Sequence, residues 1–156
     1  MRSALFSIIG AKVEGATVLD LFAGTGALGL EALSRGASRA DFVESDARLC
    51  SALQARLQDS GYRDQARVFH SRVEKALGLL SGPYDLVLLD PPYDYPAAPV
   101  LERLARSTLL APVGWVVLEH SSRTEPEQSF NKLVLAKRRR HGDTSLSIYA
   151  EDAILW

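Results

Sequence analysis

The chain has 156 residues and a formal net charge of −1; 47% of its residues are hydrophobic and 24% are charged. These values suit one soluble domain with a real core, and we expect a single domain over residues 1–156. The charge excludes a uniformly basic nucleic-acid binder, so an anionic partner would have to meet a local patch. One cysteine excludes an internal disulfide and a cysteine metal cluster, and no metal-ligand spacing is found. No apolar run is long enough for a membrane span and no signal peptide is apparent, so we expect a cytoplasmic protein.

Apolar periodicity and turn residues divide the chain into alternating helices and strands. In chain order, they predict a helix at 2–9, a strand at 17–22, a helix at 27–35, a strand at 39–44, a helix at 46–60 and a strand at 66–71. They then predict a helix at 73–80, a strand at 84–89, a helix at 99–107, a strand at 114–119, and two final strands at 131–140 and 145–149.

This alternation predicts an α/β fold, in which one doubly wound, Rossmann-like sheet of seven strands has helices on both faces. The last two strands are joined by turn residues and have no helix between them. They should form an antiparallel hairpin at one edge of an otherwise parallel sheet. In such sheets, ligands bind beyond the carboxyl ends of the strands, where the strand order reverses. If the first and fourth strands are neighbours there, the segments that follow them face one cleft.

A glycine-rich turn follows the first strand. Gly24, Gly26 and Gly29 match the pattern G-x-G-x-x-G between a strand and a helix, which is the context that this motif requires. Such glycines let the backbone approach a ligand closely, although many similar turns are only tight connections. Glu44 ends the second strand at close to the spacing expected of an acid that binds ribose hydroxyls, or it leads the next helix beside Asp46, a predicted N-cap. Together these features indicate a nucleoside-containing cofactor without identifying it.

The tetrapeptide Asp90-Pro91-Pro92-Tyr93 follows the apolar strand at 84–89. Proline fixes its own φ, lacks an N–H and favours extended geometry in the residue before it, so this segment should form a stiff shelf. The Asp90 carboxylate and the backbone carbonyls are acceptors, and the Tyr93 ring is free to stack on a flat group. The shelf therefore suits a planar group with an NH₂, such as a nucleobase amine. The alternative is that the two prolines only end the strand.

These motifs carry a resemblance to known enzymes. DLFAGTG at 20–26 and DPPY at 90–93 are together similar to S-adenosylmethionine-dependent methyltransferases that modify exocyclic or amide nitrogens. The longer string FAGTGALGLEALSRGA at 22–37, the leading helix and the closing hairpin resemble the family that methylates N2 of guanine 966 in bacterial 16S ribosomal RNA. The resemblance covers essentially the whole chain, except that the family's basic amino-terminal arm does not precede the leading helix here.

The resemblance implies S-adenosyl-L-methionine as the cofactor, and 16S ribosomal RNA or the assembled small ribosomal subunit as the partner of what we expect to be a monomer. The residues that would hold the cofactor are Asp20, Phe22, Ala23, Gly24, Thr25, Gly26, Glu44, Ser45, Asp46, Arg72, Val73 and Asp90. The catalytic set would be Asp90, Pro91, Pro92 and Tyr93. In it, Asp90 and the Pro91 carbonyl would accept hydrogen bonds from the target amine, and Tyr93 would stack on the base.

A basic run lies in the strand at 131–140. Its members Arg138, Arg139 and Arg140 are candidates for contact with RNA phosphates. The alternative is that they only form the solvated outer face of an edge strand, where charge also prevents strand pairing. We expect His120, at the end of the strand at 114–119, to be a hydrogen-bonding residue rather than a catalyst.

Three other functions fit part of the sequence. A DNA-adenine or protein-glutamine methyltransferase would share the shelf, but it needs substrate-reading insertions for which this chain has little room. An NAD-dependent oxidoreductase fits the glycine turn and Glu44, but it leaves Asp90 to Tyr93 unexplained and lacks an obvious catalytic Tyr-Lys pair or histidine. A cofactor-binding module with little turnover is the third, because the basic arm is missing.

Overall fold

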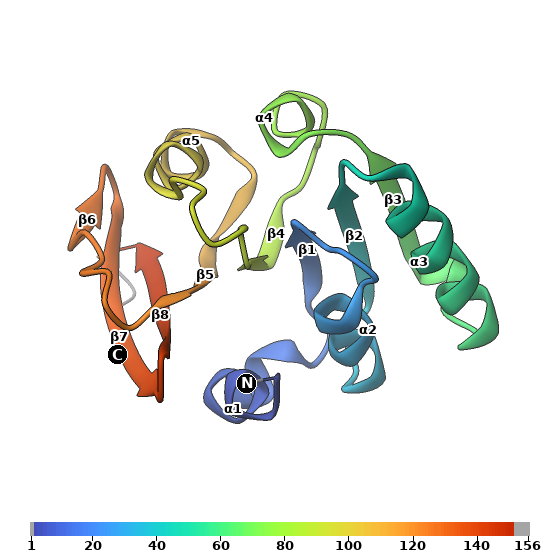
Figure 1. Cartoon of the computed structure of the whole chain (residues 1–156), viewed down its shortest axis with the longest axis horizontal. Coiled ribbons are helices and arrows are strands. Elements are labelled where there is room, and N and C mark those ends of the chain that lie inside the picture. Colours follow the sequence, from blue (N-terminus) through green and yellow to red (C-terminus); the bar gives the residue numbers. More distant parts are fainter. Residues whose placement is uncertain (1, 152–156) are drawn as a thin grey trace.

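Helices and strands alternate along most of the chain, as the sequence predicts. A computed structural model describes residues 2–151, so the ends of the expected domain, residues 1 and 152–156, lie outside the described residues (Figure 1). The helices are α1 (Arg2–Ile9), α2 (Ala27–Ser34), α3 (Ala47–Asp59), α4 (Val73–Ala76) and α5 (Ala98–Arg106), with the 3-10 helices η1 (Gly10–Val13) and η2 (Arg63–Gln65). The strands are β1 (Thr17–Leu21), β2 (Arg39–Glu44), β3 (Ala66–His70), β4 (Tyr84–Leu89), β5 (Leu110–Ser121), β6 (Ser129–Phe130), β7 (Leu133–His141) and β8 (Thr144–Glu151).

The strands form one sheet in the order β3-β2-β1-β4-β5-β8-β7-β6. The first five of these pair in parallel, and β8 pairs antiparallel with both β5 and β7. The strand order reverses between β1 and β4, which are direct neighbours. The segments after these two strands therefore begin at the same edge of the sheet, and the predicted antiparallel hairpin is confirmed as β7–β8.

Several predicted strand limits shift by one or two residues, and the sheet differs from the prediction more clearly in two places. Over residues 2–151 it has eight strands rather than seven, because β6 has only two residues and is too short to leave an alternating pattern. Strand β5 begins at Leu110 rather than at residue 114, because Leu110 pairs with Tyr84 ahead of a register shift. Pro112, which has no N–H, and Gly114, which has no side chain, lie within that irregular stretch, where both are tolerated.

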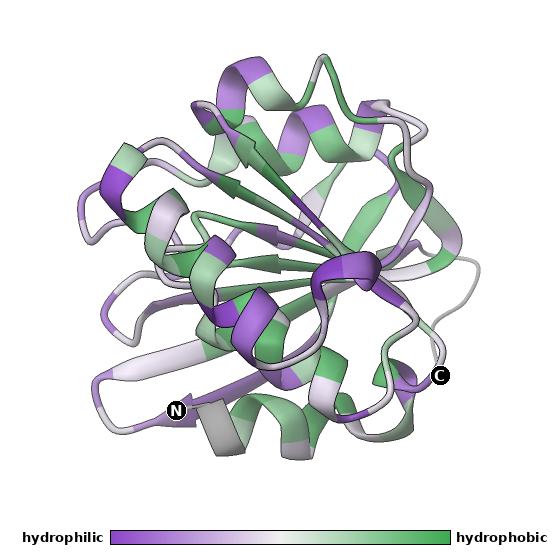
Figure 2. Cartoon of the chain, turned by 90° about the vertical axis from the view of Figure 1, so that its right-hand side faces the viewer, coloured by the Kyte–Doolittle hydropathy of each residue, from purple (hydrophilic) through white to green (hydrophobic). Residues whose placement is uncertain are grey.

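Helices cover both faces of the sheet, and each face has its own apolar core. Leu21 and Leu89 pack against α4 and α5, whereas Val18 and Leu88 pack against α1, α2 and α3. Figure 2 shows the central strands in the colour of hydrophobic residues and the helices with mixed colours. Strands buried on both faces are the most rigid part of such a fold, so the loops at their ends have a fixed base. Among residues 2–151, no helix has both the length and the apolar character needed to cross a membrane.

Candidate active site

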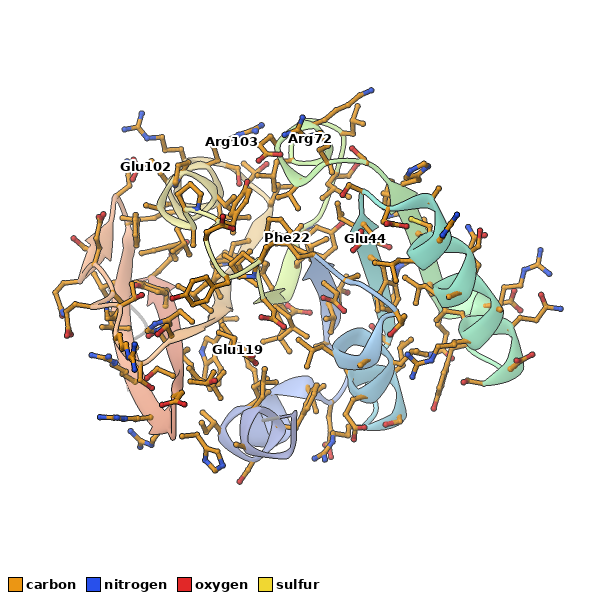
Figure 3. The ribbon with its side chains drawn as sticks, viewed as in Figure 1. Phe22, Glu44, Arg72, Glu102, Arg103 and Glu119 are labelled. Carbon is orange, nitrogen blue, oxygen red and sulfur yellow. The ribbon has the colours of Figure 1, made fainter. Side chains whose placement is uncertain are left out.

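The carboxyl ends of the four central parallel strands form the base of the candidate site. Leu21 pairs with both Val43 and Leu89, and Leu89 pairs with Leu118. The next residue of each chain segment therefore belongs to one row across the sheet. This row consists of Glu44, Phe22, Asp90 and Glu119, of which Figure 3 labels Glu44, Phe22 and Glu119. Because neighbouring strands lie about 4.8 Å apart, adjacent members of this row follow one another closely along the edge where the strand order reverses.

A cavity of about 490 Å³ lies at the ends of β1, β2 and β4; we call it the cofactor cavity. Of the residues predicted to hold the cofactor, its walls contain Phe22, Glu44, Ser45, Arg72, Val73 and Asp90. The others do not line this cavity: Asp20 and Gly26 are buried, Thr25 and Asp46 are exposed, and Ala23 and Gly24 are intermediate. The cofactor contacts of both groups stay predictions, but the structure separates the residues that line this space from those that do not.

Glu44 connects the glycine turn to the start of α3. One carboxylate oxygen accepts a hydrogen bond from the Gly24 N–H at 2.8 Å, and the other accepts from the Asp46 N–H at 2.8 Å. Asp46 is the N-cap of α3, as predicted, and its side chain accepts hydrogen bonds from the N–H groups of Arg48 and Leu49. Each Glu44 oxygen keeps a second lone pair, so this half-buried carboxylate can still accept hydrogen bonds from a pair of hydroxyls in the cavity.

The glycine turn requires backbone conformations that only small residues adopt easily. Gly24 and Gly26 have φ values of 60° and 83°, and Gly26 is the N-cap residue of α2. A Cβ on Gly26 would lie 2.1 Å from a methyl carbon of Leu53, so the turn packs directly on α3. Arg56, also on α3, donates a hydrogen bond to the Thr25 carbonyl at 2.8 Å. The turn is thus held in place by the helix that follows Glu44.

Asp20 lies beneath this turn rather than in the cavity wall. Its side chain is buried, and it accepts a hydrogen bond from the N–H of Gly29 at 3.0 Å. Burial raises the pKa of Asp20 to about 7, and the negative charges of Asp90 and Glu44 add to this shift while the Gly29 hydrogen bond opposes it. A Cβ on Gly29 would lie 2.3 Å from the Phe42 ring, so this glycine permits the close approach of α2 to the sheet.

An aromatic pair closes one side of the cofactor cavity. Phe22 follows β1 with a φ of 60°, and its ring meets the ring of Tyr95 edge to face, with centroids 4.7 Å apart. The Tyr95 hydroxyl donates a hydrogen bond to the Glu74 carboxylate of α4. Burial, followed by this hydrogen bond, raises the pKa of Tyr95 to about 12, so the phenol stays protonated. Sequence reasoning missed both Tyr95 and Glu74; the only signal was an aromatic residue two positions beyond the shelf.

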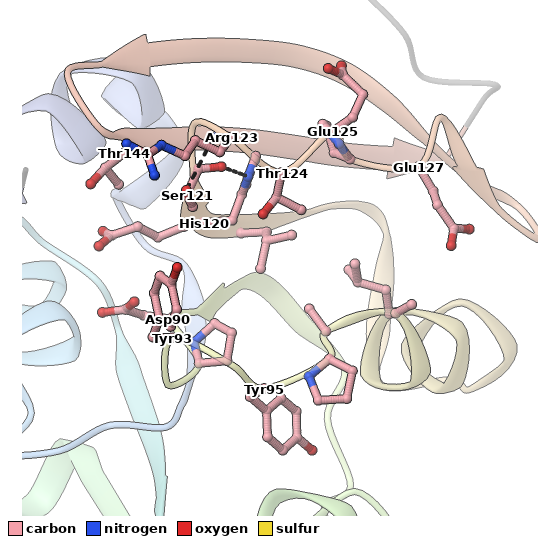
Figure 4. Close-up of a pocket in the computed structure, with 18 of the residues that line it drawn as sticks. Asp90, Tyr93, Tyr95, His120, Ser121, Arg123, Thr124, Glu125, Glu127 and Thr144 are labelled. Atoms are coloured by element: carbon pink, nitrogen blue, oxygen red, sulfur yellow. Dashed lines mark hydrogen bonds between the residues drawn. The ribbon is translucent and has the colours of Figure 1, made fainter.

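The predicted shelf separates the cofactor cavity from a second, larger one. We call this second space the target cavity, and its volume is about 850 Å³ (Figure 4). Both cavities are lined by Asp90, Pro91, Pro92 and Tyr95. Tyr93 lines only the target cavity and is 95% exposed, so its ring has a free face. Burial raises the pKa of Asp90, although its carboxylate is open to the space on either side.

The opposite wall of the target cavity comes from the end of β5 and the loop after it. Glu119 and His120 lie in this wall. One ring nitrogen of His120 is 2.7 Å from the hydroxyl of Ser147 and the other is 2.9 Å from the carbonyl of Ser121, so the expected hydrogen-bonding role is confirmed. Burial lowers the pKa of His120, which keeps it neutral near pH 7. Burial, then the charge of Asp90, raises the pKa of Glu119, a residue that the sequence analysis did not select.

The three arginines of the basic run have different surroundings on β7. Arg138 donates a hydrogen bond to the carboxylate of Glu125 at 2.7 Å, so part of its charge is neutralised within the protein. Arg139 and Arg140 are exposed, and their guanidinium groups contact only the backbone carbonyls of Arg138 and Gly142 among the described residues. The positive charges of Arg139 and Arg140 therefore remain available to an anionic partner.

Comparison with known proteins adds independent information. A protein-family model described as "Conserved hypothetical protein 95" matches residues 1–150 of this chain. A Bacillus subtilis protein named "Putative rRNA methyltransferase YlbH" is 30% identical over 153 residues, which span 96% of this chain and 83% of that protein. "Ribosomal RNA small subunit methyltransferase D" of Haemophilus influenzae is 29% identical over 96% of this chain and 79% of its own length. A solved structure of a conserved hypothetical protein from Streptococcus pyogenes matches with a TM-score of 0.91 and 32% identity, covering 98% of this chain and 96% of that one.

Proposed function

This chain belongs to the family described as Conserved hypothetical protein 95, and we propose that it is an S-adenosyl-L-methionine-dependent methyltransferase that methylates the exocyclic N2 of a guanine in 16S ribosomal RNA. The observation that carries the proposal is the shelf formed by Asp90, Pro91 and Pro92, which is shared between two adjoining cavities. A donor bound on one side and a planar amine bound on the other would meet at this shelf. The names of the two relatives support ribosomal RNA as the substrate class.

The cofactor cavity suits an adenosine group that is linked to a positively charged sulfonium. Glu44 offers lone pairs to the two ribose hydroxyls, and the apolar side chains of Phe22 and Val73 offer flat and buried surface. Asp90 and Glu44 give the cavity negative charge, which favours a sulfonium cation. When bound, S-adenosyl-L-methionine supplies an activated methyl carbon, whose bond to sulfur breaks, with the electron pair left on sulfur, as a new bond to N2 forms.

The residues of the shelf would prepare the amine for this transfer. The lone pair of guanine N2 is delocalised into the ring, so the amine is a poor nucleophile. Hydrogen bonds from its two hydrogens to Asp90 and the Pro91 carbonyl would fix an orientation in which the lone pair faces the methyl group. The same acceptors stabilise the positive charge that develops on nitrogen, and after transfer the extra proton passes from nitrogen to water, directly or through the Asp90 carboxylate. Asp90 therefore acts first as an acceptor that orients the amine.

The target base has to be unpaired or flipped out, because a base inside a duplex cannot reach the shelf. The exposed ring of Tyr93 supplies a surface on which such a base can stack. Stacking of this kind contributes about 1–3 kcal/mol per base. The rigid prolines before Tyr93 restrict its backbone, so little conformational entropy is lost there when the base binds.

The test is methylation of small-subunit RNA that lacks methyl groups, both free and assembled into the small subunit, with isotope-labelled cofactor. We expect labelled N2-methylguanosine by mass spectrometry of the digested RNA. Labelled N6-methyladenosine, or label in protein alone, would contradict the proposed substrate. Tighter binding of NAD than of S-adenosyl-L-methionine in a titration would favour the oxidoreductase, and cofactor binding without any transfer would favour a binding module.

Substitution of Asp90 tests the shelf itself. Asp90→Ala should lower the rate of methyl transfer by about 100-fold or more, the size of effect seen when one group that stabilises developing charge is removed. The dissociation constant of the cofactor should rise much less, because Glu44 keeps negative charge in the cofactor cavity. Asp90→Asn is the matched control, because it retains one carbonyl acceptor and should keep more activity than Asp90→Ala. Near-parental activity of Asp90→Ala would remove the shelf from the mechanism.

A further inference from the structure

A second carboxylate, that of Glu119, lies beside Asp90 at the rim of the target cavity. Leu89 pairs with Leu118, so the residues that follow them, Asp90 and Glu119, are neighbours on adjacent parallel strands. Both line the target cavity, whereas only Asp90 also lines the cofactor cavity. Glu119 is half-buried, so it faces the space where a base would lie without being fully open to solvent.

Glu119 offers a carboxylate acceptor in this part of the wall, and the neighbouring His120 does not compete with it. His120 has both ring nitrogens in contact with Ser147 and Ser121, so it has no free nitrogen for a base. Figure 4 places Asp90 and Tyr93 together on one wall of the cavity and His120 on the facing strand. A base that stacks on Tyr93 with its amine on Asp90 therefore presents the adjoining edge toward the end of β5.

The edge beside the amine differs between bases. The N2 amine of guanine lies between two ring nitrogens: N3, which has a lone pair, and N1, which carries a hydrogen, so that the amine and N1–H form adjacent donors on one side. In adenine and cytosine the ring nitrogen beside the exocyclic amine has a lone pair and no hydrogen. A shelf that recognises only an amine would accept all three bases. A carboxylate next to the shelf would pair with guanine alone and would repel the lone pair of the other two.

We propose that Glu119 accepts a hydrogen bond from N1–H of the target guanine and so makes the site selective for guanine. The inference rests on the proposed function, because it assumes that Asp90 holds the amine that becomes methylated. It assigns Glu119 a role in specificity, separate from the acceptor role of Asp90 in the transfer. Removing the N1 hydrogen from the base would leave the Glu119 carboxylate unpaired in a half-desolvated wall, and sites with such unpaired groups reject the wrong ligand strongly.

The test uses an RNA substrate with either guanine or 2-aminopurine at the target position. Both bases have the amine on carbon 2, but 2-aminopurine has no hydrogen on N1. The parent protein should prefer guanine in kcat/KM by about tenfold or more, the discrimination that one base-reading pair supplies. In Glu119→Gln the preference should fall to about threefold or less, because a neutral amide can rotate to present its NH₂ to a ring lone pair.

Glu127→Gln is the matched control, because it removes one negative charge from the same cavity (Figure 4). It should retain the parent's preference for guanine over 2-aminopurine. Equal rates on both bases by the parent would overturn the inference without any variant, and so would an unchanged preference in a folded Glu119→Gln protein. Absence of N2 methylation on guanine by the parent would instead overturn the proposed function, so the two failures are distinguishable.

Discussion

Phe22 and Tyr95 meet edge to face with ring centroids 4.7 Å apart, and this contact joins the segment after β1 to the segment after β4. Both rings line the cofactor cavity, and Tyr95 also lines the target cavity. The hydrogen bond from Tyr95 to Glu74 extends the connection to α4. The wall that separates the two cavities is thus held by contacts between three segments that are distant in the sequence.

Removal of the Tyr95 ring should weaken cofactor binding. Tyr95→Ala removes the edge-to-face pairing with Phe22, and an aromatic pair of this kind is worth about 0.5–1.5 kcal/mol beyond its buried area. With the missing wall surface included, we expect the dissociation constant of S-adenosyl-L-methionine to rise about tenfold in calorimetric titration. Tyr95→Phe keeps the ring and removes only the hydrogen bond to Glu74, so its effect should be smaller. Parental affinity in Tyr95→Ala would show that this wall does not contact the cofactor.

Glu44 should contribute more to cofactor binding than any other single side chain of the cavity. Glu44→Ala removes a charged acceptor from the ribose hydroxyls, and hydrogen bonds to charged groups are worth about 1.5–3 kcal/mol. We expect the dissociation constant to rise about 10- to 100-fold. Because Glu44 also accepts from Gly24 and Asp46, a loosened turn could contribute to the weaker binding. An unchanged affinity in Glu44→Ala would exclude the ribose role.

Asp20 should make the stability of the cofactor-free protein depend on pH. Its pKa is raised to about 7 in the folded protein from an ordinary value of 3.8, so ionisation favours the unfolded chain. The resulting loss in the free energy of unfolding is absent below about pH 4, grows as the pH rises, and reaches its full size above about pH 7. Asp20→Asn keeps an acceptor for Gly29 and removes this cost, which amounts to about 4 kcal/mol at most, at about 1.4 kcal/mol per pKa unit.

The measurement is chemical denaturation of the parent and Asp20→Asn at pH 5 and pH 8. The gain in free energy of unfolding of Asp20→Asn over the parent should be larger at pH 8 than at pH 5. Asp41→Asn serves as a comparison, since Asp41 is also buried, on the neighbouring strand β2, but is paired with Arg67, and this variant should be less stable than the parent. A gain from Asp20→Asn that is equal at both pH values would contradict the raised pKa.

The strand-and-helix pattern was accessible from the sequence because the central strands are apolar runs bounded by turn residues. The buried strand Tyr84–Leu89 has the predicted limits, and α1 does as well. The pattern failed where an element depends on its neighbours. Strand β6 exists only because two residues reach β7, and α4 stops at Ala76 where a turn containing Gly78 begins.

The same limit applies to the candidate site. Glu44, the glycine turn and the shelf each lie in a short contiguous motif, so local chemistry was enough to select them. Tyr95, Glu74 and Glu119 acquire their places only through the order and register of the strands, which no local pattern contains. The pairing of Arg138 with Glu125 is also tertiary, and it separates one member of the basic run from the other two.

This separation gives a specific expectation for RNA binding. The exposed residues Arg139 and Arg140 should bind phosphates, whereas Arg138 is held by Glu125. Arg139→Gln with Arg140→Gln should weaken binding of small-subunit RNA and reduce the slope of log K against log salt by about 1 for each phosphate that is no longer neutralised. Arg63→Gln with Arg106→Gln removes the same charge from exposed positions on other elements, and this control should leave the slope nearly unchanged. Equal slopes for both double variants in a filter-binding titration would mean that the arginines of β7 only solvate an edge strand.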